Sequence, residues 1–315
     1  MNDSPPFVQT PRRADRLQTL TSFLVLATAP AMLESAHWTL ALAAHFRPYL
    51  LVAWVFCGAA HLLSARFTGG TIAMVTSVFL LMGLQVDAAP QSSDRPDLEV
   101  MQVNVQMNAQ DTSALVEYIR AEDPDVVSLV EIDQRWVDAL TSALDYPHVQ
   151  VHPRPDFLGL AVLSRYPLRT FEVHDLTPGI PASTATIAGP EGEITLTTLH
   201  VLPPVRGEWA RSQEEGLEEL ARERARHGAR WVVCGDFNAT PWSRAFRRFV
   251  AQSGLAPAPT SGWFSGTWPA ALPLVGLPID HCLLAPGVRL VSAETGPALS
   301  GDHRPISVSL DTRIR

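Results

Sequence analysis

The sequence predicts an α/β fold with mixed β-sheets, preceded by helices that cross a membrane. Three observations support this fold class: the first 87 residues contain long apolar runs, strand-like and helix-like stretches alternate after residue 98, and many gaps after residue 145 are of hairpin size. Only 18% of the 315 residues are charged, below the roughly 25% typical of soluble domains. Part of the chain is therefore expected to lie in an apolar environment.

Residues 1–87 are the predicted membrane region. From Thr19 to Val86 the only charged residues are Glu34, Arg47 and Arg66. Three apolar runs lie at residues 17–36, 49–65 and 71–86. The last two approach the roughly 20 residues that cross a bilayer, whereas Pro30 and Glu34 interrupt the first. The pattern favours three transmembrane helices over two, and it disfavours a buried hairpin of a soluble protein, which normally keeps a polar face.

The arginines predict which side of the membrane holds the rest of the chain. Arginines precede the first run and Arg66 lies between the second and third, so the positive-inside rule places both in the cytoplasm. Three spans then put everything after Val86 outside, whereas two spans keep it inside. We therefore expect a multi-pass protein of the cell inner membrane with a periplasmic C-terminal domain.

The remainder of the chain is predicted to be a short linker followed by one domain. Residues 88–97 (AAPQSSDRPD) are small or polar and include proline, which is typical of a linker, and the domain covers residues 98–310. Its predicted strands are residues 98–105, 125–131, 193–200, 231–235, 279–284, 288–293 and 305–310. Its predicted helices are residues 112–122, 134–144 and 207–227.

The charge and cysteine content of the chain narrow its chemistry. Residues 88–315 carry 19 arginines, no lysine and 28 acidic residues, a net charge of −9. This balance argues against a protein that coats nucleic acid through a broad basic face, but not against an enzyme that reaches phosphate through a metal. The cysteines, Cys57, Cys234 and Cys282, lack the spacing of a zinc site. We expect no disulfide framework, with Cys234 and Cys282 as small core residues.

Polar side chains stand at the ends of several predicted strands. The positions are Asn104, Glu131, His200, Asp236, Asn238, Asp280, Asp302 and His303. Each one alone has a structural explanation, such as a turn, a helix cap or a satisfied core histidine. However, an unpaired buried charge costs several kcal/mol, and ligands bind where strand ends converge in α/β sheets. Their recurrence along the domain therefore predicts one shared site.

Five sequence blocks resemble motifs of the endonuclease/exonuclease/phosphatase superfamily. They are PDVVSLVE (124–131), GLAVLSRYPL (159–168), GDFNATP (235–241), PIDH (278–281) and GDHRPI (301–306). The resemblance covers about residues 98–310, and it is closest to a bacterial membrane-anchored branch with N-terminal hydrophobic segments. It implies a four-layer sandwich in which two mixed β-sheets lie face to face with helices outside.

The resemblance also implies a metal site. Glu131 would bind Mg²⁺ or Mn²⁺, helped by Asn104 and by Asp302. Such cations prefer oxygen ligands, and hydrolysis of a phosphoester requires the phosphate charge to be neutralised and a water to be activated. We therefore expect a divalent metal as cofactor.

The remaining motif residues are implied to act on the phosphoester. The catalytic candidates are His200, Asp236, Asn238, Asp280 and His303, and the substrate-binding candidates are Asn238, His200 and Arg304. Asp236 would position or deprotonate the attacking water, and Asp280 would orient His303. The pattern leaves open which of Asp236, His303 and His200 is the acid and which the base.

The expected activity is that of a membrane-anchored, metal-dependent phosphoesterase. Nucleic acid, phospholipid and small phosphoesters all remain substrate candidates, although the acidic domain mildly disfavours long DNA. The N-terminal helices make the lipid bilayer an expected partner, and no obligate protein partner is evident. The alternative is a membrane sensor or interaction protein that keeps the fold without turnover.

Overall fold

The computed structural model describes residues 13–260 and 264–313. The chain divides into two compact units, Met1–Gln85 and Val86–Arg315. In the described residues the first unit is helical, and the second contains the strands. The first twelve residues of the predicted membrane region lie outside the described part of the chain.

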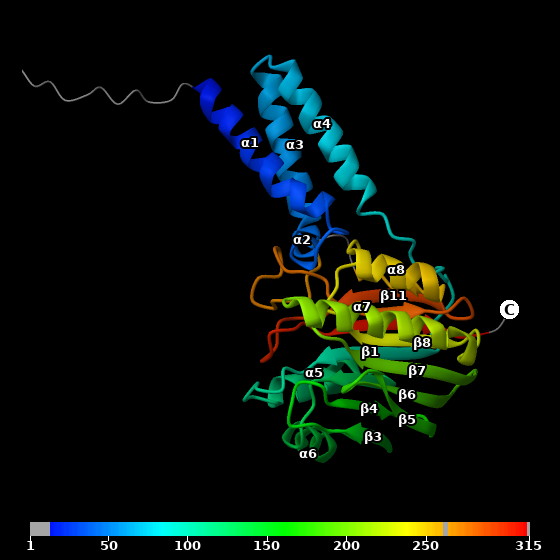
Figure 1. Ribbon diagram of the computed structural model, residues 1–315. Helices are drawn as coiled ribbons and strands as arrows, with labels where there is room; N and C mark the ends of the chain where they lie inside the picture. Colours follow the sequence, from blue (N-terminus) through cyan, green and yellow to red (C-terminus); the bar gives the residue numbers. More distant parts are fainter. Residues whose placement is uncertain (1–12, 261–263, 314–315) are drawn as a thin grey trace, which may run out of the picture. The chain divides into compact units, whose positions relative to one another are not determined.

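Four helices make up the described part of the first unit (Figure 1). They are α1 (Arg13–Met32), α2 (Trp38–Ala44), α3 (Arg47–Leu63) and α4 (Phe67–Met82). Small residues let α3 and α4 approach closely, since a Cβ added at Gly58 would lie 3.1 Å from the Cβ of Ala73. The charges of Glu34 and Arg47 pair with each other, with 2.8 Å between Oε1 and Nη2. This pairing explains how both side chains can be buried, because a lone buried charge is costly.

Among the described residues, no helix by itself is long and apolar enough to cross a membrane. α3 has 17 residues and α4 has 16, which at about 1.5 Å per residue falls short of a ~30 Å hydrocarbon layer. The pair α2 and α3, with a 60° bend between its members, meets the criterion by length and composition only. The three predicted apolar runs are thus not found as single spanning helices, because α1, α3 and α4 each end in turns before their runs do.

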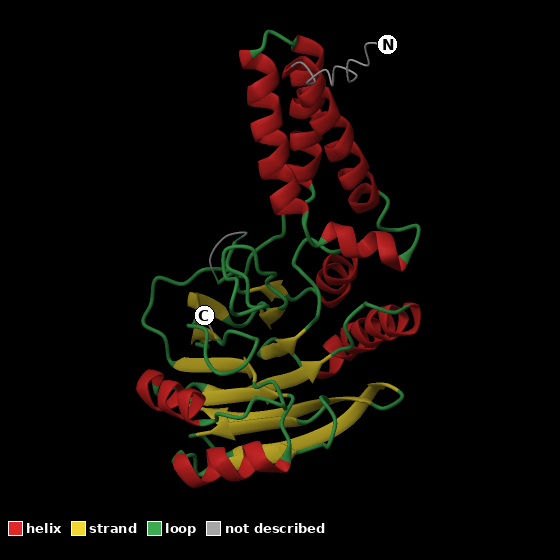
Figure 2. Cartoon of the chain, turned by 90° about the vertical axis from the view of Figure 1, so that its left-hand side faces the viewer, coloured by secondary structure: helices red, strands yellow, loops and turns green. Residues whose placement is uncertain are grey.

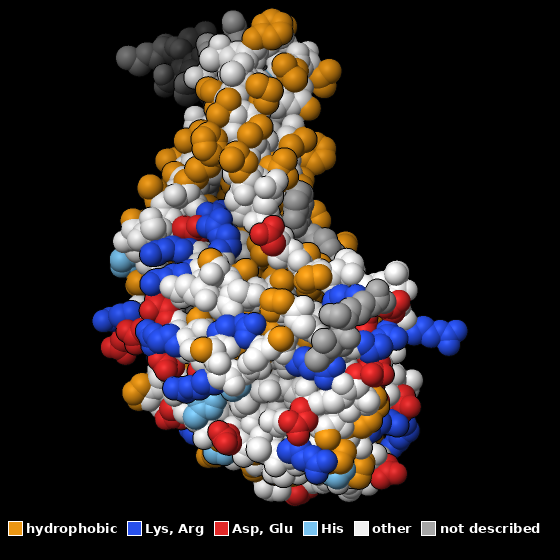
Figure 3. Space-filling model, turned by 90° about the vertical axis from the view of Figure 1, so that its right-hand side faces the viewer, with side chains coloured by type: hydrophobic (Ala, Val, Ile, Leu, Met, Phe, Trp, Pro, Cys, Tyr) orange, Lys and Arg blue, Asp and Glu red, His pale blue; other side chains and the backbone are white. Residues whose placement is uncertain are grey.

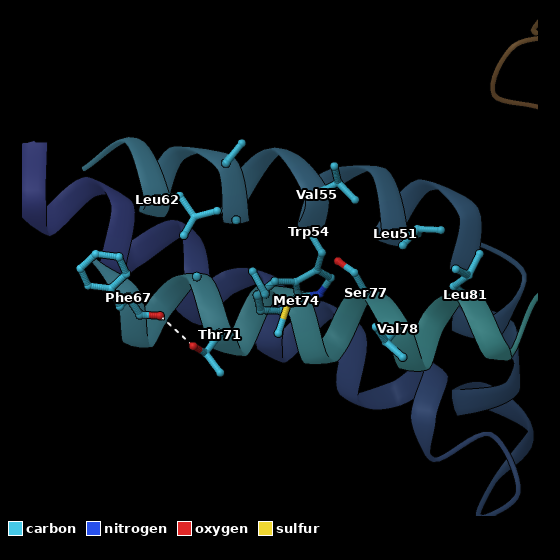
Figure 4. A pocket seen from close by; sticks show the side chains of 14 residues that line it. Leu51, Trp54, Val55, Leu62, Phe67, Thr71, Met74, Ser77, Val78 and Leu81 are labelled. Atoms are coloured by element: carbon cyan, nitrogen blue, oxygen red, sulfur yellow. Dashed lines mark hydrogen bonds between the residues drawn. The ribbon is translucent and has the colours of Figure 1, made fainter. Parts of the chain in front are cut away.

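Large apolar side chains are exposed on the helical unit. Phe23, Phe56 and Leu63 are 66%, 72% and 90% exposed, and Figure 3 shows hydrophobic side chains over the visible face of this unit. A groove of about 610 Å³ lies between α3 and α4, with Trp54 and Met74 among its lining residues (Figure 4). Large apolar side chains are therefore exposed along this unit rather than buried in a core.

Two six-stranded sheets form the second unit, in the orders β11-β12-β1-β2-β4-β3 and β5-β6-β7-β8-β10-β9. The first contains β1 (Leu98–Asn104), β2 (Val126–Val130), β3 (His148–His152), β4 (Leu160–Ser164), β11 (Arg289–Thr295) and β12 (Ile306–Asp311). The second contains β5 (Leu168–Thr177), β6 (Ile180–Gly189), β7 (Gly192–His200), β8 (Trp231–Asp236), β9 (Ala256–Pro257) and β10 (Asp280–Leu284). The pairs β1/β2 and β7/β8 are parallel and the others are antiparallel, so both sheets are mixed.

Helices lie outside the sheets, as Figure 2 shows for the second unit. They are α5 (Ser113–Glu122), α6 (Gln134–Ala143), α7 (Gly207–Arg222), a 3₁₀-helix (Glu223–Arg226) and α8 (Arg244–Ser253). Val126 of the first sheet and Val232 of the second belong to one central apolar cluster. The next residue along β8, Val233, instead packs with Phe246 of α8, because neighbouring strand residues point to opposite faces. The predicted α/β fold with two mixed sheets flanked by helices is therefore confirmed.

The segment predicted as a linker, residues 88–97, packs on the second unit. Ala89 is buried and its N–H donates to the Pro257 carbonyl at 2.8 Å, and the N–H of Ser92 donates to the Leu290 carbonyl at 2.7 Å. Strands β9 and β11 are the edges of their sheets, so they offer unpaired backbone groups to a passing segment. The polar composition identified a surface segment, but not its backbone partners.

Cys234 and Cys282 form a disulfide, which corrects the expectation that they are separate core residues. They are paired in the antiparallel register of β8 and β10, with their Cα atoms 4.1 Å apart. Their separation of 48 residues conceals this proximity, which the strand register creates. Cys57 is a buried free thiol.

Candidate active site

Polar residues at the ends of five strands meet at one edge of the second unit. Asn104 is the last residue of β1, Glu131 follows β2, and His200 and Asp236 end β7 and β8. The parallel pairing of β1 with β2 and of β7 with β8 brings these ends together within each sheet. Asp280 begins the antiparallel strand β10 directly opposite Asp236. Hydrogen bonds between the sheets join the two groups into one cluster.

The amide of Asn104 links acidic side chains from both sheets. Its Nδ2 donates to Glu131 Oε1 at 2.9 Å and to Asp236 Oδ2 at 3.0 Å. Its Oδ1 accepts the N–H of Gln106 at 2.9 Å, and the other oxygen of Glu131 accepts the N–H of Met107 at 3.3 Å. One nitrogen therefore holds two carboxylates toward the same point.

His303 is buried in this cluster and pairs with Asp280. Its Nδ1 lies 2.8 Å from Asp280 Oδ2, and its Nε2 lies 3.7 Å from Asp236 Oδ2. Gln102 donates to the other oxygen of Asp280 at 3.4 Å. Burial disfavours the charged imidazole, but the carboxylates of Asp280 and Asp236 outweigh it and raise the pKa of His303 to about 10. His303 is therefore positively charged at neutral pH and suited to face an anion.

Asp236 is almost fully buried, with 1% of its surface exposed. Its Oδ1 accepts the N–H of Asn238 at 2.8 Å. Burial and repulsion from Asp280 raise the pKa of Asp236 to about 6, against the attraction of His303 and His200. A carboxylate with such a pKa can accept a proton near neutral pH. A proton acceptor and a cationic imidazole therefore lie side by side.

His200 and Asn238 form the other side of the cluster. His200 Nδ1 lies 2.8 Å from the Phe157 carbonyl, which can only accept, so Nδ1 carries a proton. The other ring nitrogen, Nε2, is 3.6 Å from Asp236 Oδ2 and 3.9 Å from Glu131 Oε1. The Nδ2 of Asn238 lies 3.2 Å from it. The two side chains thus present neighbouring polar groups to the acids.

Backbone geometry at the strand ends is unusual. Glu131 and Asn238 have φ angles of +62° and +47°, in the left-handed region that costs a non-glycine residue about 1–2 kcal/mol. Gly235 has φ +157°, and a Cβ there would lie 2.0 Å from the Leu199 carbonyl oxygen. Such strain persists where the surrounding structure imposes it, and it is frequent at functional sites.

The acidic groups fit a hard divalent cation. The described residues include one group of side chains that could hold a metal ion, made of Asp236, Asp280 and His303. Each offers one ligand atom, and these atoms all lie within 4.8 Å of one another. Glu131 adjoins them through Asn104, and 18% of its side chain is exposed, so a solute can reach it. Carboxylate oxygens are the ligands that Mg²⁺ and Mn²⁺ prefer. The donor set is compatible with both ions and does not distinguish them.

Two predicted site residues face elsewhere. Asp302 Oδ2 accepts a hydrogen bond from Trp268 Nε1 at 3.1 Å, outside the possible metal group. The guanidinium of Arg304 donates to three backbone carbonyls at 2.7–3.4 Å. Metal binding by Asp302 and substrate binding by Arg304 therefore stay predictions. Successive residues of a turn point in different directions, and of these three residues His303 is the one bonded within the cluster.

Gln102 and Thr267 support the site although the sequence analysis did not identify them. Gln102 precedes Asn104 by two residues in β1, and this spacing places both on one face of the strand. Thr267 Oγ1 accepts the N–H groups of Ile279 and Asp280 at 3.1 and 3.2 Å. Strand alternation could have identified Gln102, whereas no local pattern distinguishes Thr267.

The fold and the cluster together define a two-sheet α/β protein with a hydrolase-like site at one edge. The model of the Endonuclease/Exonuclease/phosphatase family matches residues 101–303, and the chain belongs to this family. Its members include nucleases, phosphatases and phosphodiesterases, they generally hydrolyse phosphoester bonds, and they typically depend on a divalent metal. No curated protein sequence matches the chain.

Solved structures share the fold of the second unit. An endonuclease/exonuclease/phosphatase from Beutenbergia cavernae has 22% identity and a TM-score of 0.58, with 70% of this chain and 72% of that chain covered. TDP2 from D. rerio, solved with a single-strand DNA product, has 16% identity, a TM-score of 0.56 and coverage of 68% and 99%. A mannosyl-6-phosphatase from Bacteroides thetaiotaomicron has 16% identity, a TM-score of 0.54 and coverage of 68% and 99%. Likeness at these identities establishes the fold.

Proposed function

We propose that this protein is a membrane-attached, divalent-metal-dependent phosphoesterase that hydrolyses phosphodiester or phosphomonoester bonds. The observation that carries the proposal is the meeting of seven polar side chains from both sheets at one edge. They are Asn104, Glu131, His200, Asp236, Asn238, Asp280 and His303. The phosphoester chemistry general to the family supports the same activity.

Glu131 would hold a Mg²⁺ or Mn²⁺ ion, with Asn104 and Asp236 beside it. A bound divalent ion supplies charge neutralisation for the phosphoryl group. The neighbouring imidazolium of His303, which Asp280 stabilises, adds a second positive charge for the phosphate oxygens.

Proton transfer is divided among the buried groups. Asp236 accepts a proton from the attacking water, because its pKa of about 6 leaves it largely ionised at neutral pH. Water adds to phosphorus as it loses this proton, the P–O bond to the leaving group breaks, and the leaving alkoxide takes a proton from the His303 imidazolium to become the alcohol. His303, with a pKa of about 10, is the protonated group 3.7 Å from Asp236. Asn238 would donate its amide N–H to a phosphate oxygen, and His200 would donate to the same group through a protonated Nε2. Titratable groups with separated pKa values are typical of such acid–base pairs.

The helical unit would hold the protein at the inner membrane, with the second unit on the periplasmic side. Exposed Phe23 and Phe56 and the bent pair α2 and α3 support attachment to a bilayer. The disulfide Cys234–Cys282 supports an oxidising compartment, where such bonds persist. Protease added to intact spheroplasts should digest the second unit, with lysed cells as the positive control. Digestion only after lysis would contradict the periplasmic placement.

Hydrolysis of bis-p-nitrophenyl phosphate by the full chain tests the activity. Turnover should require Mg²⁺ or Mn²⁺, stop with EDTA and return when the metal is restored. Glu131→Gln and Asp236→Asn should each lose activity by about 10²-fold or more. Glu117→Gln is the matched control and should keep near wild-type turnover, because that acid is exposed on α5 and is not one of the seven cluster residues. Absence of EDTA-sensitive turnover on this ester, p-nitrophenyl phosphate, oligonucleotide and phospholipid would favour a non-catalytic membrane sensor.

A further inference from the structure

The loop between β9 and β10 exposes apolar side chains and carries no charge. From Leu255 to Ile279 there is no Asp, Glu, Lys, Arg or His, although 18% of the whole chain is charged. Leu272, Leu274 and Val275 are 55%, 78% and 54% exposed, and these three residues are the apolar loop tip. A cluster of exposed large apolar residues in an otherwise charged surface usually marks a binding surface.

Hydrogen bonds tie this loop to the segments that carry the active-site residues. Thr267 Oγ1 accepts the N–H of Asp280 at 3.2 Å, and the N–H of Ala270 donates to the carbonyl of Asp302 at 2.7 Å. Asp302 immediately precedes His303 in the chain. The apolar loop tip begins two residues after Ala270, so a ligand that contacts it lies near the phosphoryl site.

Trp268 precedes the apolar loop tip by four residues and contacts Asp302, the residue before His303. Its Nε1 donates to Asp302 Oδ2 at 3.1 Å, while 39% of the residue is exposed. An indole whose N–H is satisfied and whose ring is partly exposed is typical of a boundary between a polar and an apolar environment. The ligand expected here is therefore polar at one end and apolar at the other.

The absence of charge in this loop distinguishes between nucleic acid and a lipid-like group as its ligand. Nucleic acid binds chiefly through cationic side chains on its phosphates, and residues 255–279 provide none. An alkyl chain needs only apolar contacts. The chemistry of the loop therefore favours a lipid-like group over a second stretch of phosphates.

We propose that the substrate is a lipid phosphoester whose alkyl chain binds the apolar loop tip while its phosphoryl group occupies the active site. This inference rests on the proposed phosphoesterase function. Contacts with the chain lie away from the scissile bond, and binding energy of this kind can be used to position the reacting group. The apolar loop tip would therefore set substrate preference without taking part in bond cleavage.

A series of p-nitrophenyl alkyl phosphodiesters with methyl, butyl and octyl groups tests this assignment. All are assayed with the full chain at one detergent concentration, so that partitioning of an ester into detergent is the same for every variant. A fully buried CH₂ changes affinity by about 4-fold, so even partial burial predicts an octyl-over-methyl ratio of kcat/KM of about 10 or more. The variant L272S/L274S/V275S should reduce that ratio to about 2 and leave methyl-ester hydrolysis unchanged.

The matched control is V151S/V173S, which removes two exposed valines on β3 and β5 (36% and 37% exposed), the edge strands far from the loop. It should keep the wild-type chain-length preference. Equal wild-type kcat/KM for methyl and octyl esters would overturn the inference and leave the phosphoesterase proposal standing, as would a preference that survives in L272S/L274S/V275S. A preferred oligodeoxynucleotide substrate whose hydrolysis the triple variant abolishes would also overturn it. No cleavage of any ester with Mg²⁺ or Mn²⁺ would overturn both proposals.

Discussion

Cys234 of β8 is bonded to Cys282 of β10, two residues along each strand from the opposed pair Asp236 and Asp280. The bond covalently fixes the register of the two strands whose ends carry these acids. A slip in this register would move Asp280 relative to Asp236 and to its partner His303. The disulfide therefore belongs to the support of the candidate site.

Removing this bond should destabilise the folded chain. In C234A/C282A the unfolded state is no longer restricted by the link between residues 48 apart, which predicts a loss of about 2–4 kcal/mol in the free energy of unfolding. Thermal unfolding of wild type and variant measures this loss. Wild type refolded in dithiothreitol should unfold close to the variant, and a common midpoint for all three samples would contradict the prediction.

Asp280→Asn should change the pH dependence of hydrolysis. The variant keeps a hydrogen-bonding partner of similar shape but removes the nearby negative charge that raises the pKa of His303 to about 10. The pKa of His303 should fall, so the alkaline limit of activity should move to lower pH, and kcat should decrease by about 10²-fold. The pH profile of kcat, together with NMR titration of His303, measures both effects. An alkaline limit that stays in place would show that His303 does not act as the cation.

Asn104→Asp should make folding stability depend on divalent ions. The amide of Asn104 donates to both Glu131 and Asp236, and a carboxylate in its place repels both. Loss of these bonds should cost about 1–3 kcal/mol in metal-free buffer. Mg²⁺ or Mn²⁺ should restore much of this stability, so the metal-induced rise in melting temperature should exceed that of wild type. Equal rises in both proteins would contradict a metal site beside Asn104.

Acid stability should depend on Glu223, which lies 2.9 Å from His174 and 3.4 Å from His227. Burial alone favours the neutral carboxyl, but the bonds with both histidines outweigh it and lower the pKa of Glu223 from 4.5 to about 2. A carboxyl whose pKa is lower in the folded state stabilises the fold above its unfolded pKa. This stabilisation is lost as the pH falls from 4.5 toward about 2.

Glu223→Gln should therefore unfold with a flatter dependence of melting temperature on pH across that acid range. Glu117→Gln, at an exposed position on α5, is the control and should follow wild type. The same pair also affects stability at higher pH, because the bond with Glu223 raises the pKa of His174. The stabilisation from the charged imidazole is present below pH 6.5 and is lost as the pH rises through the pKa of His174 in the folded state. Parallel curves for Glu223→Gln and wild type would contradict a role for this pair in stability.

Much of the fold and of the cluster could be predicted from local patterns. Alternating strand-like and helix-like stretches predicted an α/β fold with mixed sheets, and the resemblance to the family implied helices outside them. The structure confirms both. Polar residues directly after buried strands, such as Glu131 and Asp236, were predicted to share a site, and the structure brings them to the same amide of Asn104. These predictions succeed because neighbouring residues in the sequence determine where a strand ends and whether a polar side chain follows it.

The sequence by itself determined the fold class and most of the side chains that gather at the sheet edge. Only the tertiary structure decided that Cys234 meets Cys282, that His303 rather than Asp302 or Arg304 faces the acids, and that Thr267 holds the backbone of Asp280. It also decided that, in the described part of the chain, no single helix is both long and apolar enough to cross a membrane. The physical reason is that these features depend on strand register, on the direction of each side chain in a turn and on long-range packing. Composition and periodicity describe only what lies within a few residues along the chain.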